Sequence, residues 1–151
     1  MQIIDKVADV FNILHDGSIK EWWHNEHVLT LKISCKYLAE LIHPDYNFFF
    51  IDLVGARIVE LEPWWDNIME NDILIKPEEI FAGELEILSA KVVEDKVQVA
   101  CNQRSKSLSY IGGNLIISCE NVVVHDEAKT ELSLNEFDKI CNAYWDSIGK
   151  S

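Results

Sequence analysis

The chain has 151 residues, of which 48% are hydrophobic, and its 26 acidic and 13 basic residues give a net charge of −13. This length fits a single domain over residues 1–151, and the apolar content excludes a disordered chain. Nucleic acids and anionic membranes are bound mainly through lysine and arginine, so the charge argues against both and favours a basic protein as partner.

The first predicted element is an amphipathic helix. Apolar residues recur every three or four positions over residues 3–14, which indicates one buried helical face. Asp16 and Gly17 follow and predict a turn. We expect Gly17 to take the left-handed or tight conformation there, because glycine adopts it at little cost.

A hairpin of residues 18–23 and 28–35 is predicted next. Apolar and polar side chains alternate in its second strand, which is typical of a half-buried strand. Adjacent strand residues point to opposite faces, so Trp22 and Trp23 are expected on different sides. Trp23 shares parity with Ile19, and we therefore predict that Trp23 is the buried member of the pair.

In the middle of the chain, residues 36–45 are ambiguous but compatible with a short helical turn before Pro44, and residues 47–54 predict an almost wholly apolar strand. A strand that is apolar on both faces is typical of the centre of a sheet. Gly55 predicts a tight turn into a strand at 57–61, which would make a second hairpin. Pro63 is expected to end that strand.

Two further hairpins are predicted after residue 83. Residues 85–93 and 96–102 alternate around a polar turn. The Gly-Gly pair at 112–113 lies between apolar stretches at 108–111 and 114–124. Two glycines accept the positive φ angles of a tight hairpin turn, so we expect a turn at this pair.

Two helical segments are predicted in the second half of the chain. Pro77 with two acids behind it predicts one helical turn through Phe81. Ser133 and Glu136 fit a capping box before a C-terminal helix that ends near Gly149. The sequence thus predicts an α+β fold: a curved antiparallel β-sheet of six to eight strands built from hairpins, with N- and C-terminal helices packed on it.

The four cysteines form no metal-binding or redox motif. Each of them (Cys35, Cys101, Cys119 and Cys141) lies in an apolar strand or helix pattern, which predicts reduced, buried thiols. The N-terminus lacks the features of a secretory signal, and no apolar run approaches the roughly 20 residues that span a bilayer. We therefore expect a cytoplasmic protein.

Catalytic and metal-binding signals are weak. His24 and His27 flank a turn near His15, but no third ligand follows at a suitable spacing. No nucleophile or phosphate-binding motif is present, so we expect no catalytic residue, metal or cofactor, and the balance is against an enzyme. The alternative is a small-molecule-binding protein or small enzyme, with a pocket between sheet and helices lined by His15, Asp16 and Trp22.

An acidic stretch offers a stronger candidate for a binding surface. Residues 60–86 hold nine acids and a single base, Lys76, and so contribute −8 of the total charge of −13. Aromatic residues surrounded by carboxylates suit a basic protein surface, because aromatics dominate hot spots and charge sets the encounter rate. A solvated loop whose tryptophans fold into the core would explain the same pattern. The predicted partner-binding residues are Trp64, Trp65, Asp66, Glu70, Asp72, Glu78 and Glu79.

Residues 14–19 (LHDGSI) after an amphipathic helix, and then a strand ending LTLKI, resemble a set of small bacterial proteins. The set includes immunity-type proteins of toxin–immunity systems and relatives without an assigned function. The strand–Gly–strand segment FFFIDLVGARIVELEP is also similar, so the resemblance covers about the first 65 residues. It implies a sheet-rich α+β fold and a non-catalytic binding role, and it carries over no catalytic residue.

Two functional hypotheses follow, with a third of another kind. The first is a non-catalytic, acidic protein-binding module, for which the resemblance suggests an immunity-type protein that neutralises a basic toxin. The second is the small-molecule pocket described above. The third is a structural subunit that forms a homo-oligomer through its tryptophans.

Overall fold

The computed structural model describes residues 2–65 and 73–149, which form an α+β fold around one antiparallel sheet. Within these residues there are nine strands in the order β4-β7-β6-β5-β1-β2-β3-β8-β9 and four helices. The elements in chain order are α1 (Ile3–Ile13), β1 (Ser18–Asn25), β2 (Val28–Ser34), α2 (Lys36–Ala39), β3 (Phe48–Val54), β4 (Ile58–Trp65), α3 (Pro77–Ile80), β5 (Leu85–Val93), β6 (Lys96–Gln103), β7 (Tyr110–Ser118), β8 (Asn121–His125), β9 (Glu131–Leu132) and α4 (Leu134–Gly149).

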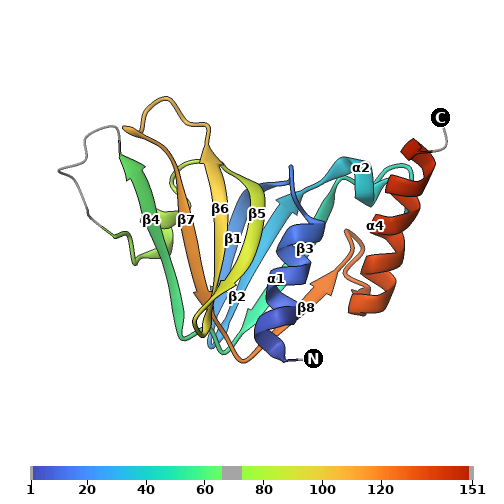
Figure 1. Cartoon of the computed structure of the whole chain (residues 1–151), viewed down its shortest axis with the longest axis horizontal. Coiled ribbons are helices and arrows are strands. Elements are labelled where there is room, and N and C mark those ends of the chain that lie inside the picture. The colour runs from blue at the N-terminus through green and yellow to red at the C-terminus, as the bar shows by residue number, and fades with distance from the viewer. Residues whose placement is uncertain (1, 66–72, 150–151) are drawn as a thin grey trace.

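The sheet bends sharply where β1 meets β5. These strands pair only at Ser18↔Glu86 and Ile19↔Leu85 and then diverge. In the strand order, β5, β6, β7 and β4 lie on one side of this junction, and β1, β2, β3, β8 and β9 lie on the other. Figure 1 shows β4 and β8 at opposite sides of the sheet. Helix α1 lies beside β5, where the amide side chain of Asn12 hydrogen-bonds the backbone N–H and C=O of Ala90 at 2.8 and 2.9 Å. The helix therefore takes over the β5 edge that β1 leaves open.

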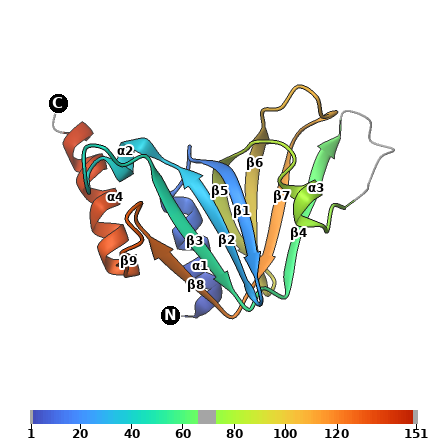
Figure 2. The ribbon, with the colours of Figure 1, turned by 180° about the vertical axis from the view of Figure 1, so that it is seen from behind.

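The apolar core fills the inside of the bend. Alternate residues of the central strands are fully buried there, as the cross-strand neighbours Leu31 and Ile51 illustrate. Helix α1 adds Val10 and Phe11 to this core, both with no exposed surface. Helix α3 lies at the opposite side of the molecule from α1 and α4, next to β4 (Figure 2).

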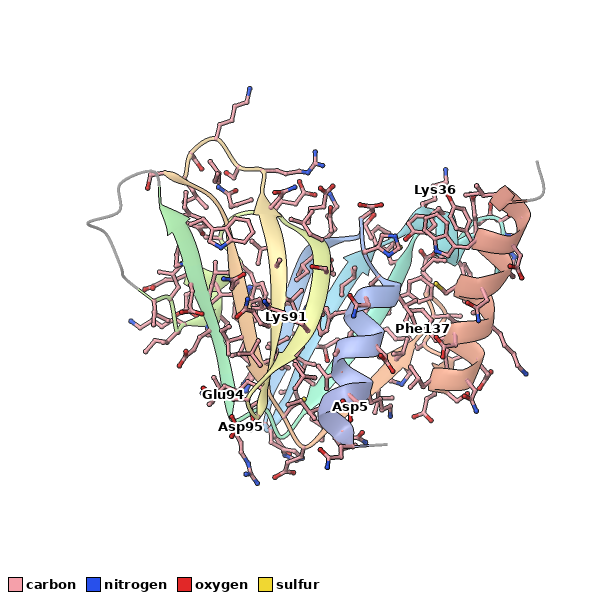
Figure 3. All side chains as sticks on the ribbon, viewed as in Figure 1. Asp5, Lys36, Lys91, Glu94, Asp95 and Phe137 are labelled. Carbon is pink, nitrogen blue, oxygen red and sulfur yellow. The ribbon has the colours of Figure 1, made fainter. Side chains whose placement is uncertain are left out.

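The C-terminal helix is buried more deeply in its first half than in its second. Phe137 is fully buried, and its ring centroid lies 5.1 Å from that of Phe49 on β3. Figure 3 shows Phe137 on the inner side of α4. Trp145 and Ile148, in the second half, each keep 45% of their surface exposed. The capping box is confirmed, because Ser133 N donates to Glu136 Oε1 and Glu136 N donates to Ser133 Oγ, each at 3.1 Å.

The predicted fold class, the terminal helices and the first and third hairpins are confirmed. The strand count of six to eight is wrong, since the described sheet has nine strands. The stretch predicted at 114–124 is split by a turn between β7 and β8, but the strand predicted at 108–111 merges into β7. The net addition is the two-residue strand β9.

The predicted hairpin at the Gly-Gly pair is wrong. Gly112 and Gly113 lie inside β7, where they pair with Asn102 and Cys101 of β6. A Cβ atom on Gly112 would lie 2.4 Å from the carbonyl oxygen of Cys101 and 2.7 Å from the ring of Trp64. The pair therefore provides room for a close approach within the sheet and makes no turn.

The predicted hairpin around Gly55 is also wrong. Gly55 does adopt a positive φ of 60°, but β3 pairs with β2 and β8, while β4 pairs with β7. The turn thus passes the chain from one half of the bent sheet to the other. Pro63 does not end β4, which continues to Trp65. A proline fits there because β4 is the last strand of the described sheet.

A bulge in β1 reverses the prediction for the first tryptophan pair. The register between β1 and β2 shifts between Ile19 and Glu21, so residue parity changes along the strand. Trp22 packs against the core, whereas Trp23 is 46% exposed.

The turn after α1 also differs from its prediction. Asp16 has the positive φ of 69°, and Gly17 does not. Gly17 is required for a different reason, because a Cβ atom there would lie 2.8 Å from the carbonyl oxygen of Leu14. The backbone N–H of Asp16 donates to Ile87 O at 2.7 Å, which ties this turn to β5.

Candidate acidic binding surface

The acids predicted to bind a partner lie partly on α3. Pro77 starts this helix, and Glu78 and Glu79 stand exposed in its first turn. Carboxylates at this end of a helix are favoured by the free backbone N–H groups. Asp66, Glu70 and Asp72 lie outside the described residues.

The two tryptophans of the acidic stretch end β4. Trp64 is half-buried, and the close approach of its ring to Gly112 places it against β7. The backbone of Trp65 belongs to β4 and pairs with Tyr110, and its side chain is not among those that the structure describes. The position of Trp64 agrees with the interpretation in which the tryptophan packs against the fold.

More acids lie along β4. Glu60 and Glu62 alternate with the fully buried Leu61, so they lie on the outer face of the sheet. Together with Glu94, from the β5–β6 turn, they line a shallow hollow of about 370 Å³ that also contains Lys96. Figure 3 shows Glu94 at the end of the molecule where the strands converge.

These acids differ from others nearby in their pairing. Glu84 forms a salt bridge with Lys20, and Glu86 forms one with Arg104. In the described part of the chain, no salt bridge involves the five carboxylates that we call the acidic surface. The acidic surface consists of Glu60, Glu62, Glu78, Glu79 and Glu94.

An apolar groove runs beside the acidic surface. It has a volume of about 340 Å³ and lies between the β1–β2 hairpin, β4 and the start of α3. Ile75 is 64% exposed at its edge, and nearby Ile73 is 49% exposed. Its lining consists of His24, Leu29, Ala56, Arg57, Ile58, Val59, Glu60, Ile75 and Pro77.

The residues predicted to line a small-molecule pocket lie in different surroundings. The ring of His15 stacks on Trp145 at 5.5 Å, and its Nε2 atom is 3.9 Å from Asp16 Oδ2. Trp22 has Phe81 as its aromatic neighbour, at 6.3 Å. Four hollows on the described surface are each lined by other residues.

The cysteines are free thiols, and none is set up as a nucleophile. Burial raises the pKa of Cys35 and of Cys101 to about 12, and it raises the pKa of Cys119 to about 11. A thiol with so high a pKa stays protonated near neutrality and reacts slowly. Among the described residues, no group of three or more histidines, cysteines or acids is placed to hold a metal.

The sequence pattern gave only part of this surface. The predicted residues included Glu78 and Glu79 but not Glu60, Glu62 or Glu94. The alternation of Glu60 and Glu62 with Leu61 was the available signal, because it puts both acids on one strand face. The contribution of Glu94 depends on a sheet order that brings β4 and the β5–β6 hairpin together across β7.

Comparisons of the chain with family models, with curated proteins and with solved structures found no significant match. None of the described helices is both long enough and apolar enough to cross a membrane.

Proposed function

We propose that this chain is a non-catalytic protein-binding module that uses the acidic surface to bind a basic protein. The observation that carries the proposal is the position of five carboxylates outside any described salt bridge, beside an apolar groove and two exposed isoleucines. Three other acids in or next to the same sheet, Glu21, Glu84 and Glu86, are paired with lysine or arginine. Carboxylates without a described salt bridge, next to exposed apolar groups, are suited to bind the basic groups of a partner.

The composition of this surface supports a protein partner. Protein interfaces combine an apolar centre that excludes water with a polar rim that sets orientation. Here Ile73 and Ile75 would supply the centre, and the carboxylates would supply the rim. The net charge of −13 would also raise the rate of encounter with a basic partner by long-range attraction.

The resemblance of the first 65 residues suggests the kind of partner. An immunity-type protein neutralises a toxin inside the bacterial cell that produces it. A toxin that binds nucleic acid carries a basic surface, and an acidic module can cover that surface by competing with the phosphates. We therefore propose a basic toxin as the partner.

The test starts with purification of the tagged protein from its native cells at low salt, followed by identification of any stoichiometric basic partner. Association with that partner is then measured for two double variants, Glu78→Lys/Glu79→Lys and Glu60→Lys/Glu62→Lys. The matched control is Asp138→Lys/Asp146→Lys on α4, which changes the net charge equally at two exposed positions.

Both surface variants should slow association by tenfold or more at low salt, and the difference should shrink as salt rises, because screening weakens long-range attraction. The control should have a much smaller effect. Equal slowing in all three variants would show that only the net charge matters. Unchanged association in both surface variants would refute the proposed surface.

A further inference from the structure

Within the described residues, the outer edge of β4 is paired with the chain at a single residue, Leu61. Leu61 and Leu74 exchange two backbone hydrogen bonds, each of 2.9 Å, on the side of β4 away from β7. Backbone groups alternate between the two edges of a strand, so the N–H and C=O of Val59 point to the same side as those of Leu61. In the described part of the chain, no strand pairs with Val59 on that side.

The start of α3 explains why the pairing stops. Continued antiparallel pairing beyond Leu61↔Leu74 would place Lys76 opposite Val59. Lys76 is instead the residue before α3, and Pro77 begins the helix. The chain thus turns away one residue after Ile75 and leaves the edge at Val59 facing the apolar groove.

The groove provides space for a side chain of an added strand. Val59 and Leu29 line it from the inner face of the sheet, while Ile58 and Glu60 line it from the outer face. A residue paired with Val59 would direct its side chain inward, toward Leu29. Its neighbour opposite Ile58 would point outward, on the face that carries Glu60, because Ile75 already takes the position opposite Glu60.

Charge determines which occupant fits. The outward side chain opposite Ile58 would have Glu60 as its diagonal neighbour, so lysine or arginine is favoured there. Arg57, which also lines the groove, is already paired with Glu120. A second copy of this chain would bring its own Glu60 and Glu62 against the same acids, and each copy carries −13. The edge is therefore suited to a basic segment of another protein and not to self-pairing.

We propose that Val59 and the adjoining groove bind an extended segment of the partner as an additional β-strand, in which apolar and basic residues alternate. Backbone hydrogen bonds to Val59 give affinity, the inward apolar side chain fills the groove, and the outward basic side chain meets Glu60. This inference rests on the proposed function and specifies how the partner is bound.

The test uses the whole protein and a short blocked peptide in which lysine and valine alternate. Binding is followed by the NMR shift and hydrogen exchange of the Val59 amide. One control peptide has the same sequence with N-methylated valines, which cannot donate strand hydrogen bonds. A second has the same composition with its lysines contiguous. The protein variant Glu60→Lys/Glu62→Lys is titrated alongside.

The alternating peptide should shift the Val59 amide in a saturable way and slow its exchange. N-methylation should weaken binding by about tenfold, the loss expected from one or two backbone hydrogen bonds. The contiguous-lysine peptide and the charge-reversed protein should also bind more weakly.

The outcomes separate this inference from the proposed function. Equal affinity for the methylated peptide, or no response at Val59, would overturn strand addition. Acidic-surface variants that still lost the cellular partner would then leave the proposed function in place. If the same variants kept full association with the cellular partner, both proposals would fail.

Discussion

The two ends of the sheet are finished in different ways. At the end formed by β3, β8 and β9, the buried Phe137 packs on Phe49 and a complete capping box starts α4. At the β4 end, one backbone bridge at Leu74 covers the edge, and Ile75 beside it is 64% exposed. At the first end, the apolar and capping groups contact other parts of the chain and stabilise the fold. At the β4 end, apolar, backbone and charged groups are exposed.

The largest expected effect is at the helical end. Phe137→Ala removes a fully buried ring and its contact with Phe49, so it should lower the free energy of unfolding by about 3–5 kcal/mol. Urea denaturation followed by circular dichroism measures this loss. Trp145→Ala, at a residue that is 45% exposed, is the comparison and should cost much less. Similar losses for both would mean that Phe137 does not anchor α4.

The β4 end should also be sensitive where its backbone is crowded. Gly112→Ala would place a methyl group 2.4 Å from the carbonyl oxygen of Cys101 and against the ring of Trp64. The carbonyl belongs to a paired strand and cannot move freely, so we expect a loss of about 1–3 kcal/mol in urea denaturation. The tryptophan fluorescence should change as well, because the Trp64 ring must shift. If Gly112→Ala kept the stability and fluorescence of the wild type, Gly112 would be packed less tightly against Cys101 and Trp64 than the structure indicates.

Much of the fold could be predicted because local patterns and tertiary contacts agree. The spacing in α1, the alternation in β2 and the capping box at Ser133 each depend on a few neighbouring residues. The wrong predictions lie where contacts between residues far apart in the sequence determine the local structure. Two glycines predict a turn from local preference alone, but Gly112 lies under Trp64, a contact that no local pattern contains.

The candidate site was harder to predict for the same reason. The bulge in β1 exchanges the roles of Trp22 and Trp23, and a parity argument assumes that no such bulge exists. The groove beside β4 joins residues from the β1–β2 hairpin, β4 and the segment before α3. Only the order of strands in the sheet brings these segments together. The acidic composition was visible in the sequence, but the open edge at Val59 was not.

A smaller effect should come from the capping box. Ser133→Ala removes the hydroxyl that accepts the Glu136 N–H, which should cost about 1 kcal/mol. Hydrogen bonds from Ser133 also lower the pKa of Glu136 below its usual value. The carboxylate's contribution is therefore present above its ordinary pKa and is lost as the pH falls through the lowered one. Ser133→Ala keeps the backbone N–H that binds this carboxylate, so the pH effect is tested with Glu136→Ala. The difference in urea stability between wild type and Glu136→Ala should shrink in acid, and a constant difference would argue against the bond from Ser133 N.

The smallest effect on stability should come from the acidic surface. Glu60→Lys/Glu62→Lys removes no described salt bridge, so the free energy of unfolding should stay within about 0.5 kcal/mol per site. A slight gain is even expected, because the variant reduces the self-repulsion of a chain with charge −13. Urea denaturation at low and high salt tests this. A large loss would mean that these carboxylates hold the β4 end together, and they would then be a structural feature in the same sense as Phe137. Near-neutral stability combined with slow partner association would instead show that these acids serve binding and not folding.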